Sequence, residues 1–355
     1  MQNTYLDKIS GSLYLAGMGD ALGAQTEQWT IDEIARVHGG LVQQFGIPPE
    51  DTFAGANAGK FAEVTDDASQ MYYLARTLVE NGGCLDYKTW VACLLDWAAT
   101  SPKASFMGPS TLGIVNALRA GQDVARVGTI GRSSRKMTTV GNTNGAAMRV
   151  APCGLVHPGN IDAACELVYV TCIPSHDTDV AISAACCIAA GCAEAITGAS
   201  LPEVIEACLR GAEAGERMGR ERARTVAGPQ MLARTEMALE IAARARDDMG
   251  FMVEMERKVG TSVLAAESVA AAVGVLAYAK ADPLRTISLA SSIGNDTDTI
   301  ATMAGAIAGA MHGSTGLPKK LLAEFLQVNR EEYRLQELSR GLSMIAARNA
   351  AEYRR

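Results

Sequence analysis

The stretch of sequence that decides the fold runs from residue 293 to residue 310 and reads IGNDTDTIATMAGAIAGA. A polar head with two aspartates and two threonines leads into a run of small apolar residues. Asp and Thr are favoured at helix starts because their oxygens accept free backbone N–H groups. Residues two apart on a continuing helix point about 200° away from each other, so Asp296 and Asp298 converge only where the backbone leaves the helix. Gly294 permits such a turn, and the pattern predicts a helix over 297–311.

Apolar residues recur at intervals of three and four along most of the chain, which is typical of helices that bury one face. In the segment from Thr65 to Asn81, Met71, Leu74 and Leu78 share a face. Alternating patterns typical of strands are nearly absent, so we expect an all-α fold. The other predicted helices cover 110–120, 145–156, 161–172, 178–197, 202–213, 230–247, 265–280 and 318–329.

The chain offers no convincing linker at which to divide it, so we expect one compact domain over residues 1–355. The stretch 46–63 is the best candidate for a long loop. Residues 210–260 are rich in Arg, Glu and Met, and we expect a variable helical segment over about 200–262. It could be a lid, a dimer surface or, most simply, a solvated helical hairpin. The tail over about 331–353 is predicted to be an extra, charged amphipathic helix.

Composition excludes several classes of protein. The formal net charge of the 355 residues is −7, which does not favour a nucleic-acid-binding surface. No run of about 18 apolar residues suggests a membrane span, and the first residues lack the layout of a signal peptide. Nine cysteines without a CxxC pair indicate buried free thiols in a reducing cytoplasm. We therefore expect a cytoplasmic protein, as a monomer or a homodimer, without nucleic-acid or membrane partners.

Acidic residues gather at four places in the sequence. These are Asp20 with Glu27, Asp66 with Asp67, Asp177 with Asp179, and Asp296 with Asp298. Independent helix caps and solvated charges explain any one pair, but a cap needs only one acceptor. Four converging carboxylates would repel one another unless two divalent cations neutralised them. Oxygen ligands without accompanying His or Cys pairs favour Mg²⁺, Mn²⁺ or Ca²⁺ over Zn²⁺.

Four separated motifs make the sequence resemble the ADP-ribosylglycohydrolase family. They are G-x-G-D-A-L-G-x-x-x-E at 17–27, T-D-D at 65–67, N-G-A-A-M-R at 144–149 and G-x-D-T-D-T-I-A-x-x-A-G-A-I-x-G-A at 294–310. They occur in the family's order, and the likeness spans roughly residues 8–316. The resemblance implies an all-α hydrolase with a site for two divalent cations, Mg²⁺ or Mn²⁺.

The resemblance also implies roles for particular residues. Glu27 and Asp67 are the expected catalytic residues, and Glu27 would do acid–base work or stabilise an oxocarbenium-like state. Asn144, Gly145 and His176 are expected to bind the substrate. The expected metal ligands are Thr65, Asp66, Asp67, Asp296, Asp298 and Thr299.

Several details depart from the family's pattern or leave alternatives open. Ser175 precedes His176 where the family often has Thr, so His176 is equally a cap or a buried residue. Asp177 and Asp179 echo the second aspartate pair, but caps on the following helix explain them better. Asn295 replaces the commoner second Gly of the last motif.

The implied reaction is hydrolysis of a glycosidic bond at ribose C1″ of an ADP-ribosylated substrate, either a protein or a small ribosyl compound. An alternative keeps the metals and fold but acts on a small nucleoside or nucleotide-like N-glycoside. A second alternative is a non-catalytic relative that only binds a ligand or serves a structural purpose. The complete set of acids argues against this last alternative.

Overall fold

The computed structural model describes residues 2–353, which form seventeen α-helices without a β-sheet. The predicted all-α class is therefore confirmed. The helices are α1 (Gln2–Gly23), α2 (Ile31–His38), α3 (Phe53–Ala56), α4 (Asp66–Glu80), α5 (Tyr87–Thr100), α6 (Pro109–Arg119), α7 (Ala151–Leu155), α8 (Ile161–Cys172), α9 (Asp179–Ala195), α10 (Leu201–Arg222), α11 (Met231–Arg244), α12 (Asp248–Glu254), α13 (Ala265–Tyr278), α14 (Pro283–Ala290), α15 (Thr297–His312), α16 (Lys319–Asn329) and α17 (Leu335–Tyr353).

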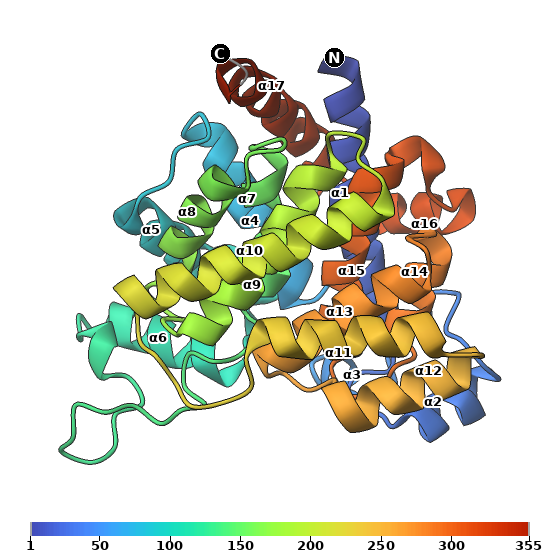
Figure 1. Ribbon diagram of the computed structural model, residues 1–355, viewed down its shortest axis with the longest axis horizontal. Helices are drawn as coiled ribbons and strands as arrows, with labels where there is room; N and C mark the ends of the chain where they lie inside the picture. The colour runs from blue at the N-terminus through green and yellow to red at the C-terminus, as the bar shows by residue number, and fades with distance from the viewer. Residues whose placement is uncertain (1, 354–355) are drawn as a thin grey trace.

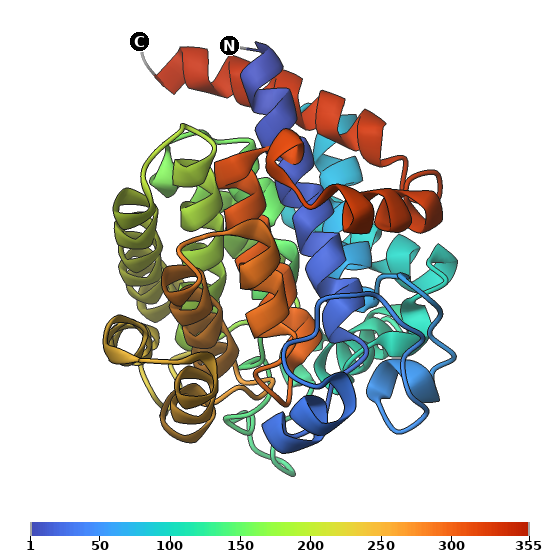
Figure 2. The ribbon, with the colours of Figure 1, turned by 90° about the vertical axis from the view of Figure 1, so that its right-hand side faces the viewer.

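The centre of the fold is the pair formed by α1 and α15, which run side by side (Figure 2). Small residues let the two backbones approach closely. A Cβ atom added at Gly11 would lie 2.4 Å from the carbonyl oxygen of Gly309, and one added at Gly19 would lie 2.4 Å from that of Ala301. Larger side chains on this seam would force the helices apart.

A second close pair, α9 with α10, crosses the front of the molecule in Figure 1. Gly211, Gly215 and Gly219 recur every four residues on the face of α10 that meets α9. A Cβ atom at Gly219 would lie 2.5 Å from the Cα atom of Asp179. This contact brings the end of α10 against the start of α9, close to the loop that carries His176.

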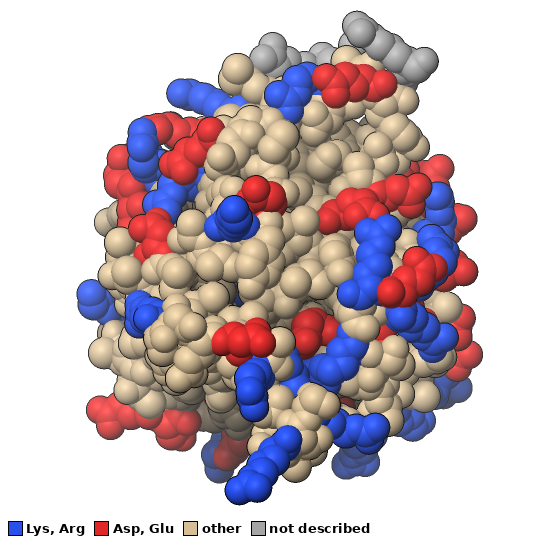
Figure 3. Space-filling model, turned by 90° about the vertical axis from the view of Figure 1, so that its left-hand side faces the viewer, with Lys and Arg blue, Asp and Glu red and all other residues tan. Residues whose placement is uncertain are grey.

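The peripheral helices cover this core from several sides. Helices α11 and α12 lie along the lower edge in Figure 1, and α17 crosses the top beside the N-terminal end of α1. The residues predicted as a variable segment thus form α10 to α12, and the predicted tail helix is α17. No helix in the described part of the chain is long and apolar enough to span a bilayer. Acidic and basic side chains are interspersed over the face in Figure 3.

Several local predictions were wrong. The predicted helix over 145–156 is a 3₁₀ turn at Ala147–Arg149 followed by the short α7, and the predicted loop over 46–63 contains α3. Helix α10 extends to Arg222, nine residues beyond the predicted end. The sequence pattern did not reveal α1, because nearly all of its sides are buried and no amphipathic period is present.

Candidate active site

A cavity of about 210 Å³ opens where the N-terminal ends of α4 and α15 face each other. All of the sequence-predicted site residues except Thr65 line it. Those that do are Glu27, Asp66, Asp67, Asn144, Gly145, His176, Asp296, Asp298 and Thr299. Residues up to about 270 positions apart in the sequence are thus brought to one place.

Asp20 holds the start of α4 in position. Its carboxylate, fully buried, accepts hydrogen bonds from the backbone N–H of Thr65 at 3.0 and 3.1 Å and from that of Ala68 at 2.9 Å. The hydroxyl oxygen of Thr65 accepts from the N–H of Asp67 at 3.3 Å, so Thr65 caps the helix. Asp66 and Asp67 then occupy its first turn and face the cavity. Asp20 itself does not line the cavity and acts as an anchor.

The turn before α15 directs Asp296 and Asp298 to the same cavity. Gly294 has φ 84° and Asn295 has φ 64°, so two consecutive residues adopt the left-handed conformation. Asn enters this region more readily than most other non-glycine residues, which explains how Asn295 replaces a glycine of the family pattern. The backbone leaves the helix at Asp296, as the convergence of the two aspartates requires.

Glu27, Asp296 and Asp298 form a compact acidic group. All three are buried, and each offers a carboxylate oxygen within 4.8 Å of those of the other two. Buried side-chain oxygens without a hydrogen-bond partner occur at Glu27 Oε2, Asp67 Oδ2 and Asp298 Oδ1. A buried polar atom without a partner costs free energy, so these orphaned oxygens indicate a site for a ligand.

Burial and mutual repulsion raise the pKa values of these acids in the metal-free protein. Desolvation raises the pKa of Asp20 and of Asp296 to about 6, although hydrogen bonds from Thr65 and Asn144 oppose the shift. The pKa of Glu27 rises well above its usual value because of burial and the nearby Asp296 and Asp66 carboxylates. Burial and neighbouring carboxylates likewise raise the pKa of Asp67 and Asp298.

Five carboxylates line the cavity and are here called the acidic cluster: Glu27, Asp66, Asp67, Asp296 and Asp298. This cluster is suited to binding divalent cations. Its donors are carboxylate and hydroxyl oxygens, which Mg²⁺ and Mn²⁺ prefer. Asp66 is half-buried and the other four carboxylates are buried, so a cation would relieve their repulsion where solvent does not. The cluster can therefore bind metal.

The polar side chains beside the acids are held in fixed orientations. The side-chain amide of Asn144 donates to Asp296 and to Ser268 Oγ, the latter at 2.9 Å. Gly145 lies directly against His176: a Cβ atom added at Gly145 would sit 2.8 Å from His176 Nε2. Only glycine leaves room for this approach.

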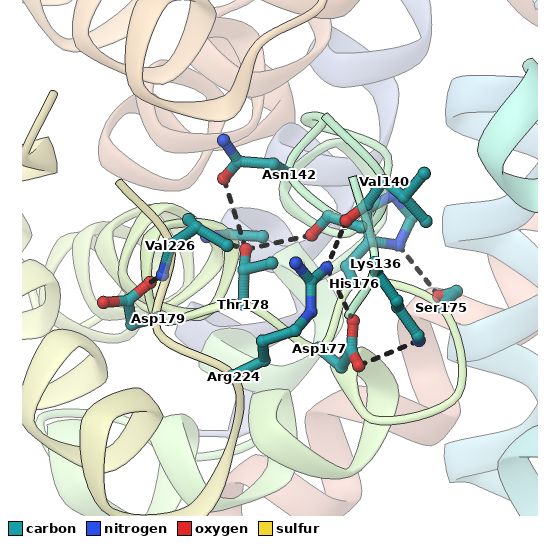
Figure 4. Close-up of polar contacts among 12 residues, drawn as sticks. Lys136, Val140, Asn142, Ser175, His176, Asp177, Thr178, Asp179, Arg224 and Val226 are labelled. Carbon is teal, nitrogen blue, oxygen red and sulfur yellow. Dashed lines mark hydrogen bonds and ion pairs between the residues drawn. The ribbon is translucent and has the colours of Figure 1, made fainter. Parts of the chain in front are cut away.

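Asp177 and Asp179 do not line the cavity. The Asp177 carboxylate forms ion pairs with Lys136 at 3.1 Å and with Arg224 at 3.3 Å (Figure 4). Asp179 Oδ1 accepts from the N–H of Val226 at 3.1 Å, and Thr178 caps α9. These acids tie neighbouring loops to the start of α9, but the cap itself is Thr178, whereas the capping interpretation expected the aspartates. The charge of Asp177 is compensated by Lys136 and Arg224.

Sequence reasoning missed several residues around the cavity. Phe53 and Phe106 line it and contact each other edge to face, with ring centroids 6.3 Å apart. Four aromatic side chains were expected as candidates for stacking on a base, namely Trp29, Tyr72, Tyr73 and Phe106. Of these, only Phe106 lines the cavity. Tyr72 is buried and donates to the carbonyl oxygen of Leu13, and Trp29 packs on His38.

Comparison with known proteins agrees with this picture. The ADP-ribosylglycohydrolase family model matches residues 1–352. The chain is 32% identical over 330 residues to uncharacterized protein YegU of Escherichia coli (strain K12), covering 92% of this chain and 94% of that protein. It is 25% identical to the ADP-ribosylarginine hydrolase Tri1 of Pseudomonas putida (strain GB-1), over 88% of this chain and 72% of Tri1.

The same likeness holds for the fold. A solved structure described as an ADP-ribosylglycohydrolase-related protein complex superposes with a TM-score of 0.66. Its chain is 21% identical, and the match covers 97% of this chain and 99% of the other. The chain therefore belongs to the ADP-ribosylglycohydrolase family of hydrolases.

Proposed function

We propose that the protein is a metal-dependent glycohydrolase that cleaves the glycosidic bond at ribose C1″ of an ADP-ribosylated substrate. The observation that carries this proposal is the acidic cluster, with orphaned oxygens on Glu27, Asp67 and Asp298 at one cavity. The relative Tri1, an ADP-ribosylarginine hydrolase, supports the substrate class.

Two divalent cations, Mg²⁺ or Mn²⁺, would be held between the two helix starts. Thr65, Asp66 and Asp67 would bind from the α4 side. Asp296, Asp298 and Thr299 would bind from the α15 side. When bound, such ions orient the ribose hydroxyls and make a water molecule a better nucleophile near neutral pH.

The protein's own groups would handle the charge that develops on the sugar. Cleavage at C1″ passes through an oxocarbenium-like state, which nearby carboxylates stabilise. Glu27 is our choice for acid–base catalysis, because its carboxyl is buried and its pKa is raised. Asp67 would complete the catalytic pair. Asn144, Gly145 and His176 would position the ribose, while Phe53 and Phe106 offer apolar surface at the same cavity.

The test combines binding with turnover. Protein treated with EDTA is titrated with Mn²⁺ and with Mg²⁺, each with and without ADP-ribose, while its melting temperature is followed. Ligands that bind only the folded state raise this temperature. We expect a rise with metal that grows with ADP-ribose, and release of ADP-ribose from ADP-ribosyl-arginine or ADP-ribosyl-serine substrates. Absence of any metal-dependent rise would refute the proposal.

A smaller substrate is the second candidate, a nucleoside or nucleotide-like N-glycoside. The cavity of about 210 Å³ favours it, because pockets for drug-sized ligands usually exceed about 300 Å³. Turnover of free nucleosides without turnover of ADP-ribosylated proteins would decide in its favour.

We further propose that the protein works in the cytoplasm as a monomer or a homodimer. All nine cysteines are free, and eight of them are buried, which suits a reducing compartment. Size-exclusion chromatography with light scattering would measure the oligomeric state.

A further inference from the structure

A chain of buried hydrogen bonds runs from Arg149 to the wall of the cavity. Arg149 lies in the turn Ala147–Arg149 and is fully buried, with its guanidinium 4.9 Å from the centre of the Trp90 ring. Its Nη2 donates to Ser175 Oγ at 3.1 Å. Ser175 Oγ lies 2.8 Å from His176 Nδ1, as Figure 4 shows, and His176 Nε2 lies 3.1 Å from Thr143 Oγ1.

The first member of this chain fixes the direction of the others. A guanidinium has donors only, so Ser175 Oγ must accept from it. The Ser175 hydroxyl hydrogen is then free to point at His176 Nδ1, which accepts. The ring hydrogen of a neutral His176 therefore sits on Nε2 and is donated to Thr143 Oγ1. Burial and the charge of Arg149 hold the pKa of His176 well below its usual value, so the ring is neutral.

The opposite arrangement is worse for a buried site. With the ring hydrogen on Nδ1, His176 would donate to Ser175, and Arg149 would occupy the other lone pair of the same oxygen. The Ser175 hydroxyl hydrogen would have no acceptor among its hydrogen-bond partners, although Ser175 is only 4% exposed. A buried donor left without a partner costs about 1–3 kcal/mol.

Thr143 is the last member and reaches the substrate. It lines the cavity and is half-buried. Because its oxygen accepts from His176, its own hydrogen is available to a ligand. We infer that Arg149 is a positioning residue that makes Thr143 a hydrogen-bond donor into the cavity, so that the substrate presents a hydrogen-bond acceptor, such as a phosphate oxygen, to Thr143. The choice of phosphate rests on the proposed function, whereas the direction of the chain does not.

Arg149 orients the metal side of the cavity in the same way. Its Nη1 donates to Gln70 Oε1 at 2.9 Å, which turns the amide nitrogen of Gln70 toward Asp66. That nitrogen donates to Asp66 Oδ2 at 3.1 Å. The buried guanidinium of Arg149 thus orients a hydrogen-bond donor on the substrate side of the cavity and a carboxylate on the metal side.

The first test reads the protonation site of His176 directly. The ¹⁵N chemical shifts of the ring nitrogens are measured in the full chain without metal or substrate, with a His176→Gln variant to assign them. We expect a protonated Nε2 and a bare Nδ1 in the wild type, and a mixture of tautomers in Ser175→Ala. A wild type protonated on Nδ1, or a Ser175→Ala protein with an unchanged tautomer, would overturn the inference. These variants avoid replacing Arg149, whose loss would disturb folding.

The second test measures the donor role of Thr143. Thr143→Val keeps the shape of the side chain but removes the hydroxyl, and Thr139→Val, on an exposed residue of the same loop, is the control. In the presence of Mn²⁺, we expect Thr143→Val to bind ADP-ribose at least about tenfold more weakly, since hydrogen bonds to charged groups are worth more than neutral ones. Unchanged affinity would overturn the donor role. If the wild-type protein did not bind ADP-ribose, the proposed function would be refuted. The tautomer of His176, measured in the first test, would still decide whether this inference holds.

Discussion

Replacing Asp296 with asparagine separates two effects of the acidic cluster, the free energy that burying its charges costs the fold and its proposed ability to bind metal. Desolvation raises the pKa of Asp296 from 3.8 to about 6 in the metal-free protein. Each pKa unit corresponds to about 1.4 kcal/mol, so the ionised Asp296 destabilises the folded state by about 3 kcal/mol above pH 6. Asparagine keeps an oxygen for the Asn144 amide and removes the buried charge. We expect Asp296→Asn to stabilise the metal-free protein at pH 8.

The size of the effect follows from the length of the chain. An unfolding entropy of about 2.1 cal/mol/K per residue over 355 residues gives about 0.75 kcal/mol/K. A gain of 3 kcal/mol then raises the melting temperature by about 4 °C. At pH 4, near the pKa of an exposed aspartate, the carboxyl is protonated in the folded state and most of the gain should disappear.

The assay is calorimetric melting of EDTA-treated protein at pH 4 and pH 8, repeated at pH 8 with Mn²⁺. Asp51→Asn, which removes an exposed aspartate, is the matched control. The wild type should gain stability with Mn²⁺, whereas Asp296→Asn should lose most of that response. A variant that is less stable than wild type at pH 8 without metal, or one that keeps the full response to Mn²⁺, would refute the reasoning.

Two further predictions follow from the same structure. The pKa values of Asp20 and Asp296 are raised to about 6 on folding, so the unfolding free energy of the metal-free protein should fall as pH rises from 4 through 6. Urea unfolding at these pH values should show a smaller fall when Mn²⁺ is present. An equal fall with and without Mn²⁺ would count against the metal site. Gly309→Ala should destabilise the protein by about 1–3 kcal/mol or more, because its Cβ would lie 2.1 Å from the carbonyl oxygen of Gly11. Gly228→Ala, which meets nothing within 4 Å, should stay within about 0.5 kcal/mol of wild type in the same urea experiment.

Local patterns predicted most of the helices, among them α4 with its one apolar face and α15, which is buried on all sides but begins with a recognisable polar cap, and they missed α1. The segment from Thr65 to Asn81 has one apolar face, and α4 occupies Asp66–Glu80 as predicted. Helix α1 is buried on nearly every side, so its period carries no signal. The segment around 147–149 has helical composition, but its backbone tightens into a 3₁₀ turn that carries Arg149. The conformation of this turn goes with the buried contacts of Arg149 and not with the helix preference of the local sequence.

The residues of the site divide in a similar way. The motifs indicated Glu27, Asp66 and Asp298, because helix capping alone does not account for so many acidic residues. They did not indicate the donor role of Thr143, since that role depends on a chain of contacts that reaches it from Arg149 through two residues of another loop. No spacing rule connects these positions along the sequence.

The packing of α1 on α15 is also what assembles the acidic cluster. A Cβ atom at Gly23 would lie 2.4 Å from the Cα atom of Asp298, so the end of α1 touches the first turn of α15. Glu27 follows four residues later and reaches Asp298 for that reason. Asp20, one turn earlier, holds the start of α4 from the same helix. The glycines of the G-x-G-D-A-L-G motif are therefore packing residues that place three separate groups of acids, and a substitution at Gly23 should disturb metal binding as well as stability.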